Sequence, residues 1–548
     1  MRWKQHCGWR GEGVEEVVLT GTLARVVLCN GMTREDRQTG SALEEWREVL
    51  RPEQVITGSE LDAYLVNCLS ITRRVLAALW PENESEVQAI VRIAARHEVR
   101  IYTFSTGHNW GYGTSMPVED DCVLLDLSRL NRILQMDGEL GLIRLEPGVT
   151  QGQLFEFLRE NDHDFFVPTT GAGPSGSLLG NALDRGFGIT PEEDHFGAVR
   201  SVRAVLADGS IYESSLASLG MPMAQSSWKW GIGPYLDGLF AQGNYGIVTA
   251  ATLALGRRPE HIEVYVFTVD DKGSLPEVAC RCRDAVTKLR GIAGGIKFMN
   301  QAQLKLTLDT SEVGMGLAPQ FAWVGFGVLH CAKAMVKAAR TELKKSLAPH
   351  LSQLIFLNDR RIQRFKRLAK FARGNLKKKI ERQVQQGEDI LQIVRGQPRA
   401  LELRLVYQHV PEPPDGPKDP VKEGVGVIWY APIIPLKQAT IAAMVAAIQT
   451  TLRSYGFPEA ISLTTVNERC AMGVIPIIYK RPEDRGNAHQ CFDTLLQEGK
   501  KAGCFPYRLN VSAMATLPED GPTFWKMARA IKDAVDPDHL LSPGRYGL

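Results

Sequence analysis

The apolar residues follow helical and strand periods from residue 80 onward. Segment 80–98 begins with a Trp-Pro pair, carries acidic residues in its first turn and has apolar residues three and four positions apart, which predicts a helix. Its apolar face consists of Val87, Ile90, Val91 and Ala94. The run 99–104 then predicts a short strand.

Further short elements follow in the first half of the chain. Residues 122–133 and 141–149 predict strands, and residues 150–162 predict a helix. Residues 198–214 predict a hairpin that turns at Asp208-Gly209. We therefore expect an α+β domain with many short strands in the first half.

A second α+β unit is predicted from about Arg258 to residue 503, beginning with a strand at 263–271 and a helix at 274–289. We expect the Pro-rich segment 410–424 to be a loop between two strands of this unit. The first forty or so residues have mixed charge and no sustained period, and we expect a loosely ordered extension there.

Residues 361–383 are strongly basic, with apolar residues every three or four positions. This pattern predicts one amphipathic helix, or two that are interrupted near Gly374. Its charges indicate either the solvated face of a packed helix or a surface for an anionic partner.

Composition narrows the class of protein. The 548 residues predict two domains, and 44% hydrophobic with 23% charged residues is typical of a globular protein. A net charge of +2 disfavours nucleic-acid and membrane partners. The chain has no long apolar run and no apolar signal segment at its start, and its ten cysteines are scattered, so we expect a cytoplasmic protein with reduced thiols. Cys280 and Cys282 have no companion pair, and we expect no metal site.

Two glycine-rich stretches carry candidate chemistry. The loop STGHNWGYG at 105–113 can turn backbone N–H groups toward an anion, because glycine accepts positive φ. The stretch GAGPSG at 171–176 matches the dinucleotide pattern G-x-G-x-x-G. We reject a Rossmann site there, because Pro168 stands where a buried strand would have to enter the first glycine.

Seven stretches in a fixed order resemble the flavoprotein family of vanillyl-alcohol oxidase and 4-cresol dehydrogenase. The resemblance extends from about residue 70 to the end of the sequence. The stretches read WPENESEVQAIVRIA, STGHNWGYG, VLLDLSRLNRI, RLEPGVTQGQLFEFL, SLLGNALDRGFG, GPYLDGLFAQGNYGIVTAATLAL and DPDHLLSPGRYG.

The resemblance implies an α+β, two-domain FAD-binding fold. Residues 70–270 would form the first part of the FAD-binding domain and residues 504–548 would complete it. Residues 271–503 would form a cap domain that covers the flavin, and residues 1–69 would be an N-terminal extension. The residues implied to bind FAD are Ser105, Thr106, Gly107, His108, Asn109, Trp110, Gly111, Pro168, Gly176, Ser177, Gly180, Asn181, Gly246, Ile247, Val248 and Arg545.

The resemblance also bears on how FAD is held. In some members of the wider superfamily a histidine of this glycine loop bonds to the flavin 8α-methyl carbon, and a neutral imidazole is a competent nucleophile. We predict such a bond through His108, with non-covalent FAD or another link as the alternatives. Vanillyl-alcohol oxidase uses a cap histidine, but Val427 or a neighbour occupies that place here, and Tyr430 is the nearby candidate for a tyrosyl link.

The implied substrate site consists of Tyr112, Tyr507 and Arg508, which match the family's phenolate-binding residues. Two hydroxyls and a guanidinium would lower the pKa of a bound phenol, and the phenolate would release hydride from its benzylic carbon to flavin N5. Segment 167–181 lacks the acidic residue that vanillyl-alcohol oxidase has near N5, so the product stays open. The candidate carboxylates are Asp184, Glu192, Glu193 and Asp194.

The sequence therefore predicts an FAD-dependent oxidoreductase of para-substituted phenols. The electron acceptor would be O2 or a protein, and we expect a homodimer. The alternatives are an alcohol or polyol oxidase on the same fold and a catalytically silent FAD-fold protein that serves as an interaction partner.

Overall fold

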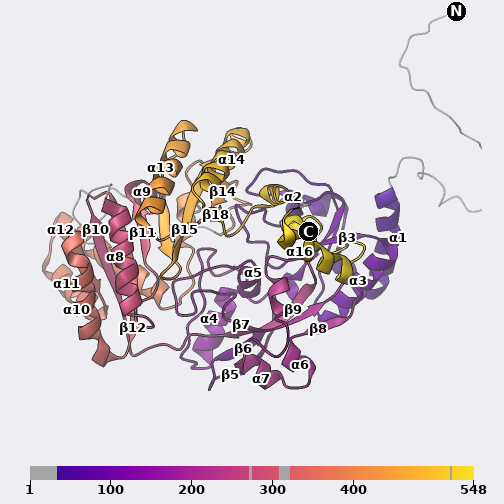
Figure 1. The fold of residues 1–548 in the computed structure, drawn as a ribbon, viewed down its shortest axis with the longest axis horizontal. Coiled ribbons are helices and arrows are strands. Elements are labelled where there is room, and N and C mark those ends of the chain that lie inside the picture. Colours follow the sequence, from indigo (N-terminus) through magenta and orange to yellow (C-terminus); the bar gives the residue numbers. More distant parts are fainter. Residues whose placement is uncertain (1–33, 271–273, 308–320, 417, 519–520) are drawn as a thin grey trace, which may run out of the picture.

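The computed structural model describes residues 34–270, 274–307, 321–416, 418–518 and 521–548. They form three sheets with helices packed against them, which confirms the α+β prediction. Two sheets lie in the N-terminal half of the chain, and the third and largest lies in the part that we call the cap (Figure 1). Within the described residues, no helix is long and apolar enough to cross a membrane.

The first sheet has four strands in the order β1 (Val55–Ile56), β2 (Val75–Leu79), β4 (Cys122–Asp126) and β3 (Arg100–Phe104). Helix α3 (Glu84–His97) begins at Asn83, whose side chain accepts a hydrogen bond from the N–H of Glu86, and its predicted apolar residues are all buried. The parallel pairing of β2, β4 and β3 needs such a crossover helix.

The predicted extension is only partly separate from this sheet. Residues 1–33 lie outside the described residues, whereas helix α1 (Arg34–Val49) packs on α3 through the fully buried Trp46. The Trp46 indole donates a hydrogen bond to the Ile90 carbonyl at 3.2 Å. Helix α2 (Asp62–Leu65) follows β1. The described part of the extension is therefore ordered, because a tryptophan anchors it to α3.

The second sheet has five antiparallel strands. Their order is β5 (Ile133–Asp137), β6 (Leu142–Leu145), β9 (Ile247–Ala254), β7 (Val199–Val205) and β8 (Ile211–Glu213). The predicted hairpin is confirmed, since Val205 pairs with Ile211. The helices associated with this sheet are α4 (Gln151–Glu160), α5 (Leu178–Leu183), α6 (Ser215–Ser218) and α7 (Pro222–Ser227).

The cap is built on the third sheet, which has nine strands. The main path is β13 (Gln353–Leu357), β10 (His261–Val269), β12 (Trp323–Cys331), β11 (Lys297–Asn300), β16 (Ser462–Thr465), β17 (Cys470–Tyr479), β15 (Pro432–Pro435) and β18 (Phe505–Pro506), with β14 (Gly426–Tyr430) paired to β17. Its helices are α8 (Leu275–Lys288), α9 (Gln301–Thr307), α10 (Val336–Leu347), α11 (Asp359–Phe371), α12 (Gly374–Val394), α13 (Gln438–Ser454) and α14 (Arg485–Lys501).

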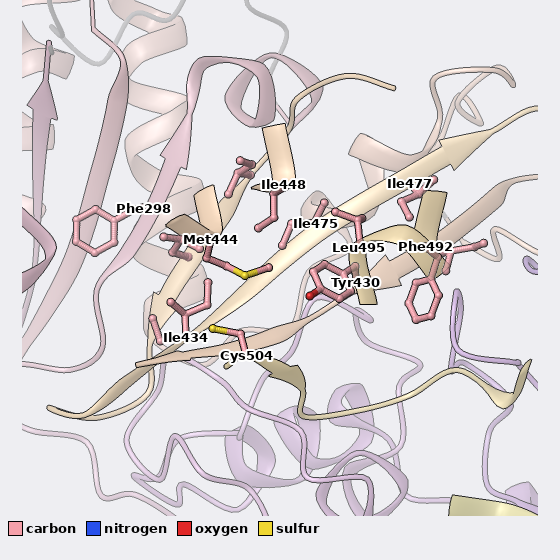
Figure 2. Packing of buried hydrophobic residues seen from close by; sticks show 14 of the residues in the cluster. Phe298, Tyr430, Ile434, Met444, Ile448, Ile475, Ile477, Phe492, Leu495 and Cys504 are labelled. Atoms are coloured by element: carbon pink, nitrogen blue, oxygen red, sulfur yellow. The ribbon is translucent and has the colours of Figure 1, made fainter. Parts of the chain in front are cut away.

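The cap core lies between its sheet and helices α13 and α14 (Figure 2). Met444 and Ile448 of α13 and Leu495 of α14 are fully buried. The rings of Tyr430 and Phe492 meet edge to face at 6.0 Å in this core.

The basic segment and the residues before the 410–424 loop are both helical. The basic segment forms two helices, α11 and α12, and the break falls at Gly374, whose φ is +58°. The strand expected before the 410–424 loop is wrong, because residues 401–406 form a 3-10 helix. The run LELRLV has the alternation of a strand, but Leu405 and Val406 both pack beside Trp110 instead.

The C-terminal segment returns from the cap to the N-terminal sheets. It contains α15 (Val511–Met514), α16 (Thr523–Val535) and a final 3-10 turn (Arg545–Gly547). The buried Lys532 ammonium donates to Asp536 at 2.5 Å and to the carbonyls of Asn244 and Leu541 at 2.7 and 3.0 Å. In Figure 1 this yellow helix lies beside the indigo elements, and Ile101 forms a parallel bridge with Leu541. The end of the chain is thus bound to β3.

The Glu193 carboxylate joins the N-terminal sheets to the cap. Its Oε1 accepts a hydrogen bond from the Gly295 N–H at 2.5 Å, just before β11. Burial raises the pKa of Glu193 to about 7, so the folded protein holds this proton more strongly than the unfolded chain does.

We predict that Glu193→Gln removes a pH-dependent loss of stability. The unfolded carboxyl titrates near 4.5 and the folded one near 7, so wild type loses stability relative to the variant as pH rises through that window. The difference should reach roughly 3 kcal/mol and stay constant above about pH 8. Denaturant unfolding of both proteins across this range measures it, and a difference that does not depend on pH would contradict the prediction.

Candidate active site

A cavity of about 410 Å³ lies where the N-terminal sheets, the cap and the C-terminal segment meet. Most of the residues predicted to bind FAD or substrate line it, whereas Gly111 and Pro168 do not. Those on its wall are Ser105, Thr106, Gly107, His108, Asn109, Trp110, Tyr112, Gly176, Ser177, Gly180, Asn181, Gly246, Ile247, Val248, Tyr507, Arg508 and Arg545.

The glycine loop follows directly from the end of β3. Gly107 and Gly111 have φ values of +69° and +74°, which favour glycine. A Cβ on Gly111 would lie 2.4 Å from the Trp429 ring, so this glycine allows the loop to press against β14 of the cap. The N–H groups of residues 106–110 donate to no acceptor in the described residues. The loop therefore offers a row of free backbone donors beside the cavity.

His108 lies in this row with its ring held on two sides. Its Nδ1 lies 3.0 Å from the Ser175 carbonyl, and the ring stacks on Trp110 with centroids 4.7 Å apart. Burial lowers the pKa of His108, so the neutral imidazole is favoured. Because a carbonyl can only accept, Nδ1 carries the proton and Nε2 keeps its lone pair.

Helix α5 forms the wall opposite the loop. Ser177 caps this helix: its hydroxyl accepts from the Gly180 N–H at 2.8 Å and donates to the Pro147 carbonyl at 2.6 Å. A Cβ on Gly180 would lie 2.3 Å from Ser105 Oγ, so the glycine is required for the close approach of the two walls. Asn181 donates to Nδ1 of the buried His195 at 2.5 Å.

Asp184, at the end of α5, organises the inner end of the cavity. Its carboxylate forms an ion pair with Arg508 at 3.0 Å and accepts hydrogen bonds from Arg545 and from the Tyr546 hydroxyl, each at 3.2 Å. Its backbone carbonyl accepts from Nε of Arg508 at 3.0 Å. Arg545 also donates to the Tyr102 hydroxyl at 3.3 Å. One buried carboxylate thus positions two arginines that come from the C-terminal segment.

The three predicted substrate residues come together here. The Arg508 guanidinium lies 5.1 Å from the Tyr112 ring centre and 5.5 Å from that of Tyr507. Gln242 fixes the Tyr507 backbone by donating to its carbonyl at 2.8 Å. Neither tyrosine hydroxyl is hydrogen-bonded to a described residue, and Nη2 of Arg508 is buried without a partner in the same set.

The charges of this group follow from its surroundings. Burial raises the pKa of Tyr112 well above its usual value, so the hydroxyl keeps its proton. Burial alone would lower the pKa of Arg508, but Tyr507 and Asp184 outweigh it and the pKa is raised. The site therefore presents a permanent cation and, on Tyr112, a neutral hydroxyl donor.

The carboxylates were only partly predicted. Asp184 lines the cavity, whereas Glu192, Glu193 and Asp194 do not. Sequence reasoning missed Glu402, which comes from the cap and forms an ion pair with Lys297 at 2.8 Å on the cavity wall. The Lys297 charge lowers the pKa of Glu402.

Glu402 also reaches the segment in which the sequence offers no carboxylate. Its Oε2 would lie 2.6 Å from a Cβ on Gly171, so the glycine makes room for it. No signal in segment 167–181 could have indicated a residue more than 200 positions away.

Val427 lines the cavity, but Tyr430 does not. The Tyr430 side chain is fully buried in the cap core, beside Phe492 and Leu495 in Figure 2, and its hydroxyl points to Gly499. The suggestion of a link through Tyr430 is therefore wrong, because this residue faces the helices of the cap.

The cavity fits a flavin dinucleotide. A row of free backbone N–H groups with Arg545 suits a pyrophosphate, and the apolar start of β9 with the cap residues provides walls for a ring system. The inner end, with its unpartnered guanidinium nitrogen, suits an anionic oxygen.

Comparisons with known proteins agree with this geometry. The FAD binding domain family matches residues 75–215. The chain is 32% identical to 1'-carboxy-chondrochloren decarboxylase of Chondromyces crocatus, over 92% of this chain and 96% of that protein. It is 27% identical to the 4-cresol dehydrogenase [hydroxylating] flavoprotein subunit of Pseudomonas putida, over 95% and 98%.

Solved structures show the same relation. The structure of p-cresol methylhydroxylase with substrate bound matches with a TM-score of 0.79 and 26% identity, over 95% of this chain and 99% of that one. The 4-ethylphenol oxidase from Gulosibacter chungangensis has the same fold, with a TM-score of 0.81 and 20% identity over the same shares. The chain therefore belongs to the FAD-dependent oxidoreductase family of 4-cresol dehydrogenase and has the two-domain FAD-binding fold of the vanillyl-alcohol oxidase type.

Proposed function

We propose that this enzyme oxidises para-substituted phenols at the benzylic carbon. The observation that carries the proposal is the buried Nη2 of Arg508, which has no partner in the described residues. Its guanidinium lies 5.1 and 5.5 Å from the ring centres of Tyr112 and Tyr507. An unpaired buried donor of this kind is costly unless a ligand completes it.

The chain's own residues would activate the phenol. Arg508 is always charged, so it stabilises the phenolate and lowers the pKa of the bound phenol. Tyr112 remains protonated and would donate a second hydrogen bond. The ring centre of Tyr507 lies 5.5 Å from the same guanidinium. FAD, held by the glycine loop and Arg545, would supply the hydride acceptor.

The oxidised substrate would be a quinone methide, and Glu402 would direct the addition of water to it. Lys297 keeps this carboxylate ionised, so it can take a proton from a water that attacks the benzylic carbon. The product would then be the benzylic alcohol. Glu402 would thus supply the base that segment 167–181 lacks.

A second candidate is oxidative decarboxylation. It is favoured by Lys297, which lies on the cavity wall and uses one of its three N–H groups on Glu402, and by the decarboxylase relative. A carboxylate on the carbon next to the benzylic one would leave as CO2. The electron pair of the broken C–C bond would then form the vinyl double bond and convert the quinone methide into a 4-vinylphenolate. In both reactions the substrate is oxidised by two electrons.

Anaerobic spectra of the purified holoenzyme test the proposal. We expect 4-alkylphenols to bleach the flavin band, whereas alditols and sugars should not. A panel that includes 3-(4-hydroxyphenyl)propanoate separates the two candidates, since only decarboxylation releases CO2. Bleaching by alditols alone would favour the polyol oxidase, and no bleaching by any compound would favour the silent protein.

Replacing Arg508 by leucine should impair phenol oxidation. Loss of the fixed charge should cost about 2–4 kcal/mol of transition-state stabilisation, or roughly thirty- to a thousand-fold in kcat/KM. Arg508→Lys keeps the charge and should recover part of the loss. FAD content and unfolding temperature serve as controls, because Arg545 and Tyr546 still hold Asp184 in both variants. Unchanged kinetics in Arg508→Leu would contradict the assignment.

We also propose the covalent bond between His108 and FAD. Its support is the neutral ring with Nε2 free, beside the cavity. After acid precipitation the flavin should stay with the protein and fluoresce on a denaturing gel, and His108→Ala should release it while still binding FAD. Complete release of flavin from the wild-type protein would exclude the bond.

The domain boundaries, the electron acceptor, the oligomeric state and the cellular location are part of the same proposal. Residues 70–270 with 504–548 would form the FAD-binding domain and residues 271–503 the cap, with β10 and β18 as the two strands next to these boundaries that pair in the cap sheet. The electron acceptor would be O2 or a protein. A homodimer is supported by segment 219–236, where Trp228, Trp230 and Ile232 are each more than half exposed. We place the enzyme in the cytoplasm, because the eight cysteines among the described residues are free and mostly buried.

A further inference from the structure

The turn that joins α11 to α12 exposes three large apolar side chains. Leu368 is 56% exposed, Phe371 is 86% exposed and Leu376 is 60% exposed. An aromatic ring that is almost wholly in water contributes little to the fold. These residues are therefore available to another surface.

Helices α11 and α12 pack on the cap through other side chains. Ile362 of α11 and Val384 and Leu391 of α12 are buried against the cap sheet. Ion pairs between Lys366 and Glu388 at 2.6 Å and between Asp359 and Arg395 at 2.6 Å fasten the helices together further along. Figure 1 shows both helices at the outer edge of the cap, on the side away from α1 and α3.

Unpaired cations surround the exposed apolar residues. Ten of the residues from 360 to 380 are lysine or arginine and none is acidic. Within the described part of the chain, four exposed cations next to the turn have no ion-pair partner. These four are Arg367, Lys370, Arg373 and Lys378. The net charge of +2 for the whole chain conceals this local excess.

We propose that the α11–α12 turn, residues 367–378, docks this enzyme on an anionic lipid surface. The cations would lie among the headgroups, and Leu368, Phe371 and Leu376 would enter the boundary of the acyl chains. A nucleic acid would satisfy the charges but would leave Phe371 in water, and so would an acidic protein without an apolar pocket beside its carboxylates. The combination of both features selects the lipid surface, in contrast to the prediction from net charge that the enzyme has no membrane partner.

Vesicle sedimentation of the full-length holoenzyme tests this proposal. We expect binding to vesicles of one-third phosphatidylserine in phosphatidylcholine, none to pure phosphatidylcholine, and weaker binding as salt is raised. The triple variant Arg367→Gln, Lys370→Gln, Arg373→Gln should bind on the order of a hundredfold more weakly, at about 1 kcal/mol for each cation. The double variant Phe371→Ser, Leu376→Ser should lose at least about tenfold.

A matched control and a second readout separate insertion from adhesion. Phe524→Ser removes a ring that is 70% exposed on α16, outside the basic cluster, and should leave binding unchanged. Emission of an added tryptophan in Phe371→Trp should shift to the blue on the anionic vesicles, measured as a difference from the parent protein. No binding to these vesicles would overturn the proposal, as would binding that the Phe371→Ser, Leu376→Ser variant retains in full.

Discussion

The carboxylate of Asp184 holds the active end of the cavity together. It receives two arginines and a tyrosine hydroxyl, all of which come from the last 41 residues of the sequence, while Asp184 itself ends a short helix of the N-terminal half. Removing one partner from such a buried network leaves the others with uncompensated charge. The position of Arg508, and with it the direction of its unpartnered nitrogen, therefore depends on this one residue, through both its carboxylate and its backbone carbonyl.

Close approach of backbones is the second constraint. Gly111 lets the cofactor loop touch Trp429 of the cap, Gly180 lets α5 touch Ser105, and Gly171 admits Glu402. At each position a methyl group would collide with a neighbouring side chain. At these three places, small residues bring cavity walls from distant parts of the sequence within contact distance.

Local patterns and family motifs were sufficient for much of this arrangement. The helix at 84–97, the hairpin around Gly209 and the break at Gly374 follow from periodicity and turn chemistry. The pair Lys297 and Glu402 could not be predicted, because only the tertiary fold brings β11 and a 3-10 turn together. Tyr430 was misjudged because neighbouring strand residues point to opposite faces, so an uncertain register reverses the direction of the side chain.

The return of the C-terminal segment has a consequence for how the protein is made. Strand β3 and the turn at Asn244 are synthesised early. Their contacts form late, because Asn244 contacts Lys532, 288 positions further on, and Ile101 of β3 contacts Leu541. A ribosome-bound chain can complete the cap sheet except β18 while its cofactor half still lacks Arg508 and Arg545. Cofactor capture during biosynthesis should therefore be a late event, because it requires residues 508–545.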